Sequence, residues 1–425
     1  MSFHDAEILG GLLEQAGYTK TAAPTEADVI IFQTCCVRET AERKIYGQVK
    51  EWSRLKREKP DLIIGLSGCL AQKDREQALE ECPHLDFVLG TERLGDLPAL
   101  LAALKKGRSG IVAVDDEPRP EGLPLERADG VRAYVNISYG CNNFCAYCIV
   151  PYVRGPERSR APAAVLAEVE EAARQGYREV MLLGQNVNTY GRDLDNAVDF
   201  AALLRRVDKV PGIERIRYMT SHPRDFTAET IRAVRETEKV CEHFHLPLQA
   251  GSDEILQKMN RGYTRRHYLT LVDQVRSLVP EASITTDLIV GFPGETEADF
   301  EATLDMVEQV HFDAAYTFMF SPREGTRAAT LPAQVPAAVK KDRLARLNAV
   351  QNRISRELNE RLVGQVVEVL VEGPSKHDPE RLAGRTRTNK LVHFPGPVEL
   401  TGELVQVRIE RAYTWTLTGR LVDRT

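Results

Sequence analysis

Short apolar runs alternate with amphipathic helical stretches along most of this 425-residue chain. In its first part, helical patterns surround the runs DVIIFQTC, LIIGLSGC and FVLG, and one helix is expected over residues 72–81. This alternation favours a parallel sheet with helices packed on both faces, because parallel strands are joined by crossover connections that helices usually supply. We therefore predict a doubly wound α/β domain over residues 1–114.

A proline-rich acidic stretch, DDEPRPEGLPLERADG at residues 115–130, interrupts the alternation and predicts a linker. Six strand candidates follow it, each ending in turn residues: VRAYVNIS, EVMLLG, RIRYMT, HFHLPL, SITTDLIVG and AAYTFMF. Because a closed barrel of this kind has about eight such units, residues 131–359 are expected to form a partial (β/α)6 barrel, with a long connecting helix over 340–361. Short β-rich runs separated by Gly and Pro predict a small all-β barrel over residues 360–425.

Composition excludes several classes of protein. Hydrophobic residues make up 43% and charged residues 28% of the chain, which is ordinary for a globular protein and excludes a disordered or collagenous one. The net charge of −6 excludes a strongly basic nucleic-acid coat protein, so any RNA contact requires local basic patches. No signal-like N-terminus and no run of about 18 apolar residues occurs, so we expect a soluble cytoplasmic protein without a membrane partner.

Three of the eight cysteines form a CxxxCxxC loop directly after the first strand of the second domain: Cys141, Cys145 and Cys148. A closed zinc site needs about four ligands, and no fourth Cys or His lies close by in the sequence. The loop also lacks the fourth cysteine of a ferredoxin-type cluster. Three thiolates suit a 4Fe–4S cluster with one open iron, and a zinc knuckle or a chance cluster is the alternative.

This spacing, at the carboxyl end of the first strand of a partial barrel, resembles the radical S-adenosylmethionine (SAM) enzymes. The resemblance implies that the open iron binds SAM and that one electron from the cluster cleaves it to a 5′-deoxyadenosyl radical. Gly184, Gln185 and Asn186 follow the second barrel strand, where these enzymes hold the SAM amino group; an ordinary turn is the alternative. Ser221 and His222 close the third strand and receive no role.

Two further cysteines end strands of the first domain. Cys35 ends DVIIFQT and Cys69 ends LIIGLSG. Functional groups of a doubly wound sheet cluster outside the carboxyl ends of its strands, so these two thiols are expected to lie near each other. Two thiolates do not complete a three-ligand cluster, and the chain begins almost directly in its first helix.

Long segments of the chain together resemble the methylthiotransferases, among them ADVIIFQTCCVRETAERKIYGQ, VNISYGCNNFCAYCIVPYVRGPERSR, HLPLQAGSDEILQKMNRGYT and DLIVGFPGETEADF. The resemblance implies an N-terminal methylthiotransferase domain, a radical SAM core and a C-terminal TRAM domain. It also implies an auxiliary 4Fe–4S cluster with three N-terminal cysteines, of which Cys35 and Cys69 match two. Met1 matches the Met of the Gly-Cys-Gln-Met-Asn type segment that carries the first, so we expect that the sequence starts too far downstream. Ligation by Cys36 is the weaker rival, because adjacent side chains of extended chain point to opposite faces.

The resemblance implies an enzyme, a tRNA methylthiotransferase. Within the family it favours the members that add a methylthio group to carbon 2 of dimethylallyl-modified adenosine beside the anticodon, using two SAM molecules and two 4Fe–4S clusters. The alternatives are threonylcarbamoyl-adenosine in tRNA, an aspartate of a ribosomal protein, or a non-catalytic iron–sulfur RNA-binding protein with an incomplete auxiliary cluster. The expected partners are the anticodon stem-loop of tRNA and an electron donor such as flavodoxin or ferredoxin, and we expect a monomer.

Two basic runs suit phosphate contacts to RNA. They comprise Arg154, Arg158 and Arg160 after the cysteine loop, and Arg381, Arg385, Arg387 and Lys390 in the last domain. The association of TRAM domains with tRNA points the second run toward RNA. A solvated charged face is the alternative for both runs.

Several other residues have an ordinary structural explanation. His243 and His245 alternate along the fourth barrel strand and so share one face, but histidines satisfied within a core are more common than ligands. Cys82 and Cys241 match no ligand of the family and are predicted to be buried free cysteines. The turn GFPGET at residues 291–296 resembles the adenine-contacting strand end of the family, although a lone glycine pattern is weak support for it.

Overall fold

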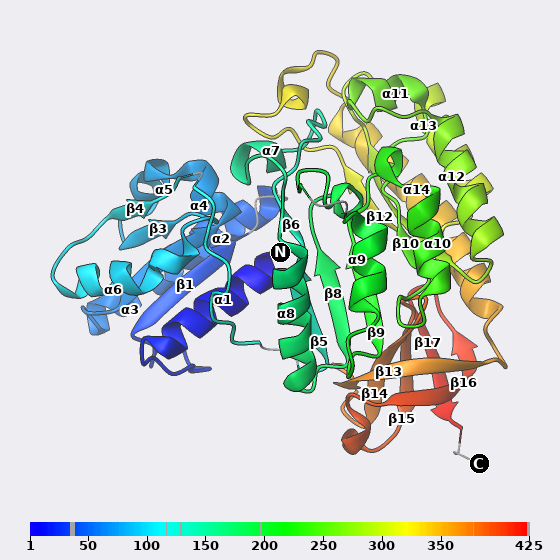
Figure 1. Ribbon diagram of the computed structural model, residues 1–425. Helices are drawn as coiled ribbons and strands as arrows, with labels where there is room; N and C mark the ends of the chain where they lie inside the picture. The colour runs from blue at the N-terminus through cyan, green and yellow to red at the C-terminus, as the bar shows by residue number, and fades with distance from the viewer. Residues whose placement is uncertain (35–38, 116, 128–129, 196–197, 377, 423–425) are drawn as a thin grey trace. The chain divides into compact units, whose positions relative to one another are not determined.

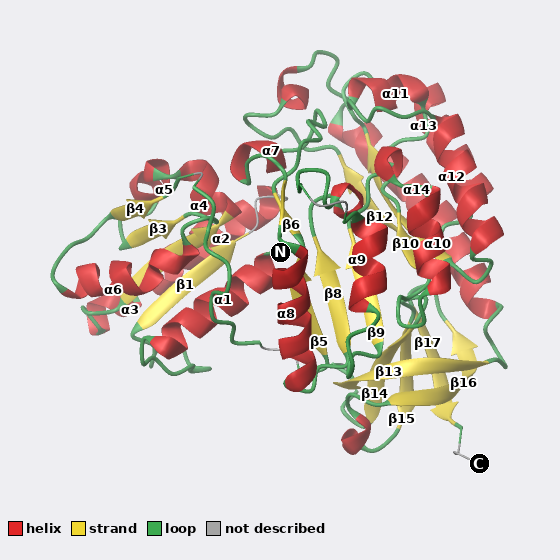
Figure 2. Ribbon diagram, viewed as in Figure 1, coloured by secondary structure: helices red, strands yellow, loops and turns green. Residues whose placement is uncertain are grey.

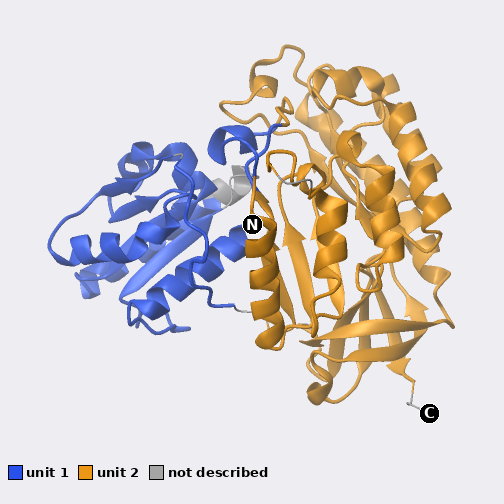
Figure 3. Cartoon of the chain, in the orientation of Figure 1, with its two compact units in different colours: residues 1–128, 139–142, 148–158 blue, residues 129–138, 143–147, 159–425 orange. Residues whose placement is uncertain are grey.

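The computed structural model describes residues 1–34, 39–115, 117–127, 130–195, 198–376 and 378–422. The chain forms two compact units (Figure 3). The first consists of Met1–Ala128, Tyr139–Asn142 and Cys148–Arg158, and the second of Asp129–Ser138, Asn143–Tyr147 and Ser159–Thr425. The chain therefore passes repeatedly from one unit to the other within the segment that carries the three-cysteine loop.

A parallel four-stranded sheet forms the centre of the first unit, with strand order β1-β2-β3-β4 (Figure 1). Its strands are β1 (Val29–Thr34), β2 (Ile63–Gly68), β3 (Phe87–Leu89) and β4 (Ile111–Ala113). Its helices are α1 (Ser2–Gln15), α2 (Glu39–Trp52), α3 (Leu55–Glu58), α4 (Cys69–Asp74), α5 (Glu76–Glu81), η1 (Leu94–Asp96) and α6 (Leu97–Lys105).

Successive side chains of these strands enter two separate cores, one on each face of the sheet. Ile63 and Phe87 pack with α1 and α6, whereas the next residues along the two strands, Ile64 and Val88, pack with α2, α4 and α5. Side chains of a strand alternate between its faces, so an unbroken apolar run buries both. The arrangement confirms the doubly wound α/β architecture predicted for this part of the chain.

Six parallel strands, each followed by a helical segment, form the barrel of the second unit (Figure 2). They pair as two halves, β5-β8-β9 and β10-β11-β12. The strands are β5 (Arg132–Asn136), β8 (Glu179–Leu183), β9 (Arg215–Met219), β10 (His243–His245), β11 (Ser283–Val290) and β12 (Ala314–Met319), with a short sheet of β6 (Ser138–Tyr139) and β7 (Arg158–Ser159). This confirms the partial (β/α)6 barrel.

The helices of the barrel bury apolar faces against one continuous core. They are α8 (Pro162–Arg174), η2 (Val187–Thr189), α9 (Phe200–Val207), α10 (Ala228–Glu236), α11 (Asp253–Lys258), α12 (Arg265–Leu278), α13 (Glu297–Val310), η4 (Arg327–Thr330) and α14 (Ala337–Glu360). Two short helices do not join this core: η3 (Pro223–Asp225) and α7 (Val150–Val153), whose Val153 packs with Cys69. Of these, α7 belongs to the first unit. The predicted connecting helix is α14, and its residues Leu347 and Ile354 are fully buried in the core of the barrel.

The C-terminal part of the second unit is a closed five-stranded barrel with its own small core. Its strands run in the order β13-β14-β15-β17-β16, and β16 returns to pair with β13. They are β13 (Val366–Pro374), β14 (Arg381–Thr386), β15 (Leu391–Pro395), β16 (Leu404–Ala412) and β17 (Thr416–Leu421), with η5 (Val398–Leu400) between β15 and β16. The predicted all-β barrel is thus confirmed, and closure leaves it without an unpaired edge.

The first unit differs from the prediction in three places. The short strand β4 was not predicted, since three residues are too few to show a period, and it forms because it pairs with β3. The helix predicted over residues 72–81 is two helices, because Arg75 adopts a left-handed φ of 48°. In the predicted linker, Leu123 and Leu125 pack against the core that contains α1 residues. The Glu126 amide also donates to the Glu7 carbonyl of α1. The described part of this segment is therefore held in place by contacts with the first unit.

No helix within the described ranges of the chain is both long enough and apolar enough to cross a membrane.

Candidate functional site

The three-cysteine loop begins at the carboxyl end of the barrel strand β5 and ends at α7. Cys141 and Cys145 are buried and Cys148 is half-buried. Cys141 and Cys148 belong to the first unit and Cys145 to the second. No group of three or more His, Cys, Asp or Glu side chains suited to a metal ion is present among the residues that the structure describes. The fit to an iron–sulfur cluster therefore rests on the donor set, the side chains of three cysteines on one short loop.

The middle of this loop is anchored within the second unit. The Ala146 amide donates to the Met259 carbonyl at 2.9 Å, and the Ala146 carbonyl accepts from the Ala328 amide at 2.7 Å. The Sγ of Cys145 accepts a hydrogen bond from Nη1 of Arg261 at 3.3 Å. Both backbone bonds of the adjacent Ala146 thus hold the Cys145 thiol beside a buried guanidinium.

Buried polar atoms without a partner gather where the barrel strands end. Within the described part of the chain, the following have no hydrogen-bond partner: Ser138 Oγ, both amide atoms of Asn188, Ser221 Oγ, His222 Nε2 and Gln249 Oε1. They follow β5, β8, β9 and β10, so four successive strands contribute to one edge. Buried polar groups are nearly always hydrogen-bonded, and an unpaired set at one place therefore fits a polar ligand.

The backbone is strained at the same edge. Thr220, directly after β9, has φ 73°, and Gln249, four residues after β10, has φ 70°. Neither is Gly or Asn, so the left-handed conformation costs about 1–3 kcal/mol at each position. Strain of this kind persists where the surrounding structure holds a functional group in place.

His222 is a neutral imidazole that uses one ring nitrogen within its own segment. Burial, and then the nearby Arg261 guanidinium, lowers the pKa of His222 to about 2. Its Nδ1 accepts from the Arg224 amide at 3.3 Å, which assigns the proton to Nε2. The unpartnered Nε2 is therefore a buried N–H donor.

Asn186 positions His222. The Oδ1 of Asn186 accepts from the His222 amide at 3.1 Å, and its Nδ2 donates to Asp225 at 2.9 Å. Burial raises the pKa of the Asp225 carboxyl, but the bound Arg224 guanidinium outweighs it and keeps the pKa below its ordinary value. Both the oxygen and the nitrogen of the Asn186 side-chain amide thus have hydrogen-bond partners within the protein.

The two residues before Asn186 are also placed at this edge. A Cβ on Gly184 would lie 2.5 Å from Ser138 Oγ, so a larger residue here would require the Ser138 side chain to move. Gln185 is partly exposed. The segment predicted from sequence for the SAM amino group therefore lies among the unpartnered polar atoms.

Cys69, at the start of α4, is the predicted ligand of the auxiliary cluster that lies within the described residues. It is buried against Ile149 and Val153 of the segment that follows the cysteine loop. Its Sγ accepts from Nε of Arg154 at 3.1 Å, and Arg154 also donates to Asp5 at 2.8 Å. Cys35 and Cys36 lie outside the described residues.

Every basic residue predicted for RNA contact has a carboxylate partner in the protein. The ion pairs are Arg154 with Asp5, Arg158 with Glu92, Arg160 with Glu168, Arg381 with Asp378, Arg385 with Glu372, Arg387 with Glu242, and Lys390 with Asp313. Arg387 and Lys390 thereby join the C-terminal barrel to the (β/α)6 barrel. Among the seven, the side chains of Arg158 and Arg381 are the most exposed, at 34% and 43%.

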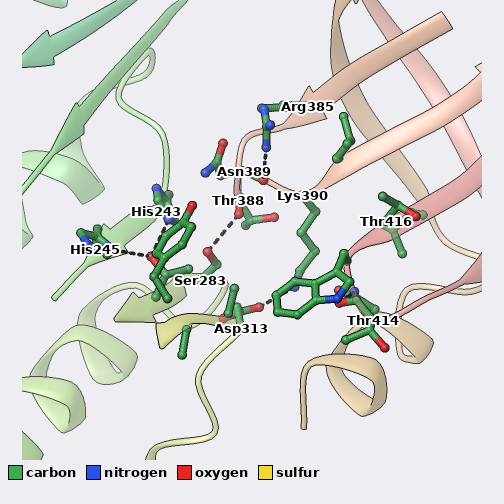
Figure 4. Close-up of a pocket in the computed structure, with 18 of the residues that line it drawn as sticks. His243, His245, Ser283, Asp313, Arg385, Thr388, Asn389, Lys390, Thr414 and Thr416 are labelled. Carbon is green, nitrogen blue, oxygen red and sulfur yellow. Dashed lines mark hydrogen bonds and ion pairs between the residues drawn. The ribbon is translucent and has the colours of Figure 1, made fainter. Parts of the chain in front are cut away.

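His243 and His245 line a pocket of about 160 Å³ in the second unit, together with Arg385 and Lys390 (Figure 4). Both rings lie within 3.0 Å of Thr285 Oγ1, so they are satisfied core histidines. Burial, more than any neighbouring charge, lowers the pKa of His243. The structure thus confirms the structural explanation for this pair.

Cys82 and Cys241 are buried free cysteines, as predicted. Burial raises the pKa of both thiols. Neither is a reactive thiolate.

Sequence reasoning missed several residues of the strand-end edge. Gln249 and Arg261 lie in the quoted segment HLPLQAGSDEILQKMNRGYT, but no motif rule singles them out. Within the described part of the chain, Arg261 is buried without a partner carboxylate and Gln249 Oε1 is buried without a hydrogen bond, and both properties depend on the folded neighbours. Ser138 and Asn188 carry no signal in the sequence beyond their position after a strand.

Three family models match the chain: the Radical SAM superfamily at residues 135–307, the uncharacterized protein family UPF0004 at residues 1–90, and the TRAM domain at residues 360–422. A curated relative from Moorella thermoacetica, named tRNA-2-methylthio-N(6)-dimethylallyladenosine synthase, is 56% identical over 100% of this chain and 96% of its own length. A relative of the same name from Thermoanaerobacter pseudethanolicus is 52% identical over 100% of this chain and 91% of its own.

Solved structures share the fold at low identity. The radical SAM methyltransferase TsrM from Kitasatospora setae, with cobalamin and a 4Fe–4S cluster bound, superimposes with a TM-score of 0.59 at 15% identity, covering 76% of this chain and 70% of its own. The cobalamin-dependent radical SAM enzyme OxsB gives a TM-score of 0.52 at 14% identity, covering 82% of this chain and 53% of its own.

The partial barrel, the cysteine loop at its first strand end and the polar edge beside it define a radical SAM enzyme. SAM and 4Fe–4S clusters are the cofactors that this class implies. More narrowly, the chain belongs to the family of the tRNA-2-methylthio-N(6)-dimethylallyladenosine synthases, radical SAM methylthiotransferases that end in a TRAM domain.

Proposed function

We propose that this protein adds a methylthio group to carbon 2 of the dimethylallyl-modified adenosine next to the anticodon of tRNA. The observation that carries the proposal is the polar edge of the barrel: unpartnered buried atoms follow four strand ends, and one of them, on His222, lies near the Arg261 guanidinium that donates to Cys145 of the loop. Family membership supplies the substrate, since the full-length relatives are named for this product.

We assign Cys141, Cys145 and Cys148 to the cluster that binds SAM. When bound there, the cluster supplies the electron that cleaves SAM to the radical needed for an inert aromatic C–H bond. Cys69, together with Cys35 outside the described residues, is assigned to the auxiliary cluster. Among the described residues, Cys69 directly follows β2 and the three-cysteine loop follows β5, so both lie at the carboxyl ends of parallel strands.

The residues of the polar edge bind and orient the ligand. Nε2–H of His222 donates a hydrogen bond, and Gln249 Oε1 accepts one. Asn186 acts through His222, because its own amide is satisfied by Asp225 and by the His222 backbone. Gly184 and Gln185 complete the edge, and the burial of Asn186 and His222 keeps water from the radical.

The proposed partners are the anticodon stem-loop of tRNA and a small electron donor such as flavodoxin or ferredoxin. The TRAM domain supports the first of these. Arg158 and Arg381 are the preferred phosphate contacts among the predicted basic residues, because their side chains keep the greatest exposure. We further propose that the enzyme acts as a monomer in the cytoplasm, where its tRNA substrate is found.

The test is mass spectrometry of tRNA nucleosides from a strain lacking the gene, complemented with variants of this chain. Wild type and the matched control Cys241→Ala should restore the methylthio-dimethylallyl nucleoside, whereas Cys145→Ala should leave the dimethylallyl nucleoside unmodified. Persistence of the product in the deletion strain would overturn the proposal. Loss of a methylthio-threonylcarbamoyl nucleoside instead would assign the alternative substrate.

A further inference from the structure

Arg261 is a buried cation in an unusual setting. It is 4% exposed and follows α11 in a turn where Asn260 and Gly262 have φ values of 57° and 68°. Its Nη2 donates to the Pro247 carbonyl at 2.9 Å and its Nε to the Tyr263 hydroxyl at 3.2 Å. The guanidinium is therefore fixed in orientation by groups that carry no charge.

The remaining nitrogen of the guanidinium faces the cysteine loop. Nη1 donates to Cys145 Sγ and to the Tyr147 hydroxyl, both at 3.3 Å. Arg261, Cys145 and Tyr147 all belong to the second unit. The planar guanidinium thus bonds through Nε and Nη2 to the barrel and through Nη1 to the loop that carries the thiols.

No carboxylate pairs with Arg261 among the residues described by the structure. The other six described arginines that are less than a tenth exposed each pair with Asp or Glu: Arg119, Arg154, Arg160, Arg215, Arg217 and Arg343. An arginine side chain stays protonated in proteins, and a buried charge without a partner costs several kcal/mol. An anion bound next to Cys145 would therefore stabilise the buried charge of Arg261.

We propose that Arg261 is the counter-charge of the iron–sulfur cluster held by Cys141, Cys145 and Cys148, and that its hydrogen bond to Cys145 Sγ raises the reduction potential of that cluster. The inference rests on the proposed function, which assigns the three thiols to the cluster. A thiolate-bound cluster carries net negative charge, and reduction adds to it. A fixed cation and an N–H donor at a ligand sulfur stabilise the reduced form more than the oxidised form.

Arg261 is thus a positioning residue for electron transfer to SAM. It acts through Cys145, and its charge rather than its shape is the property that matters. A lysine keeps the charge but loses the fork, whereas a glutamine keeps an N–H donor but loses the charge. These two substitutions therefore separate the two contributions.

The experiment is an anaerobic redox titration of the reconstituted full chain, followed by electron paramagnetic resonance. A Cys69→Ala background removes a proposed ligand of the auxiliary cluster, and the signal that changes on addition of SAM identifies the SAM-binding cluster. We expect Arg261→Gln to shift the midpoint potential to more negative values, and Arg261→Lys to stay close to the starting protein. The matched control is Arg217→Met, which removes a buried arginine paired with Glu179 and should leave the potential unchanged.

Equal midpoint potentials in Arg261→Gln and the starting protein, at equal iron content, would overturn the inference. If Arg261→Gln assembles no cluster while Arg261→Lys does, the requirement for a charge is supported. If neither variant assembles one although circular dichroism is unchanged, Arg261 holds only the loop backbone and the inference fails. Absence of the cluster from the wild type would instead refute the proposed function.

Discussion

Arg154 donates a hydrogen bond from Nε to the Sγ of Cys69 over 3.1 Å. The same guanidinium donates to the fully buried Asp5, which also accepts from Arg119 at 2.9 Å. Arg154, which follows the cysteine loop, is thereby bound to the Cys69 thiol after β2 and to Asp5 of α1, and all three residues belong to the first unit. Asp5 is the anion that makes this arrangement possible.

The first prediction concerns the stability of this unit. Asp5→Asn leaves two buried guanidinium groups without an anion, and breaking a buried ion pair in this way costs about 3–5 kcal/mol. Urea unfolding followed by Trp52 fluorescence measures the loss, in a Trp415→Phe background because these are the only two tryptophans. As a control, Lys20→Gln removes the exposed Lys20–Glu126 pair and should cost roughly 1 kcal/mol or less. A loss as small as that for Asp5→Asn would contradict the structure.

The second prediction is the pH dependence of the same contribution. Burial acts to raise the pKa of the Asp5 carboxyl, but Arg154 and Arg119 outweigh it and hold the pKa well below its ordinary value of 3.8. The unfolded chain then binds a proton that the folded chain does not, so the contribution is present above 3.8 and is lost as the pH falls toward the folded pKa. The difference in unfolding free energy between wild type and Asp5→Asn should be constant at higher pH and shrink below that value. A difference that grows on acidification would show the opposite sign.

The third prediction separates ligand cysteines from structural ones. Cys148→Ala should lose the iron of one cluster and the release of 5′-deoxyadenosine from SAM, because two thiolates do not hold the cluster. Cys82→Ala, at a fully buried site of the first unit, should keep both and lose only modest stability. Iron analysis and chromatography of the products measure the two outcomes. Equal iron content in the two variants would contradict the assignment.

The fourth prediction tests which arginines meet RNA. Arg381→Gln should reduce the slope of log affinity against log salt concentration by about 0.7–0.9 if it removes one phosphate contact. Arg387→Gln should leave the slope unchanged and destabilise the protein, because it breaks the pair with Glu242. Fluorescence anisotropy with labelled tRNA at several salt concentrations gives both slopes. The reverse pattern would place the RNA contact at Arg387.

The fifth prediction concerns His222. His222→Phe removes the Nε2 donor and should weaken SAM binding about tenfold, the range of one hydrogen bond to a polar ligand. His222→Gln can present an N–H near the same place and should weaken it less. Equilibrium dialysis of SAM with the reconstituted enzyme measures both. Equal affinity in wild type and His222→Phe would mean that Nε2 faces another ligand.

Much of the fold follows from patterns that are local in the sequence. The apolar runs around Ile63 and Phe87 bury both faces of a sheet, and the stripe containing Leu347 and Ile354 predicts one long helix. The prediction failed at Arg75 and β4, where a left-handed residue and a long-range strand pair decided the structure. Neither feature has a periodic signal, because each depends on a single residue or on a distant partner.

The spacing of Cys141, Cys145 and Cys148 and the alternation of strands and helices by themselves determined the class of chemistry and the architecture. Both are local, since side-chain periodicity and ligand spacing are properties of neighbouring residues. Only the tertiary structure decided which charges are balanced. It paired Arg154 with Asp5 and Arg387 with Glu242, and Arg261 faces Cys145 with no carboxylate partner among the residues that the structure describes. The physical reason is that the energy of a buried charge depends on the groups that the fold brings within a few ångströms of it.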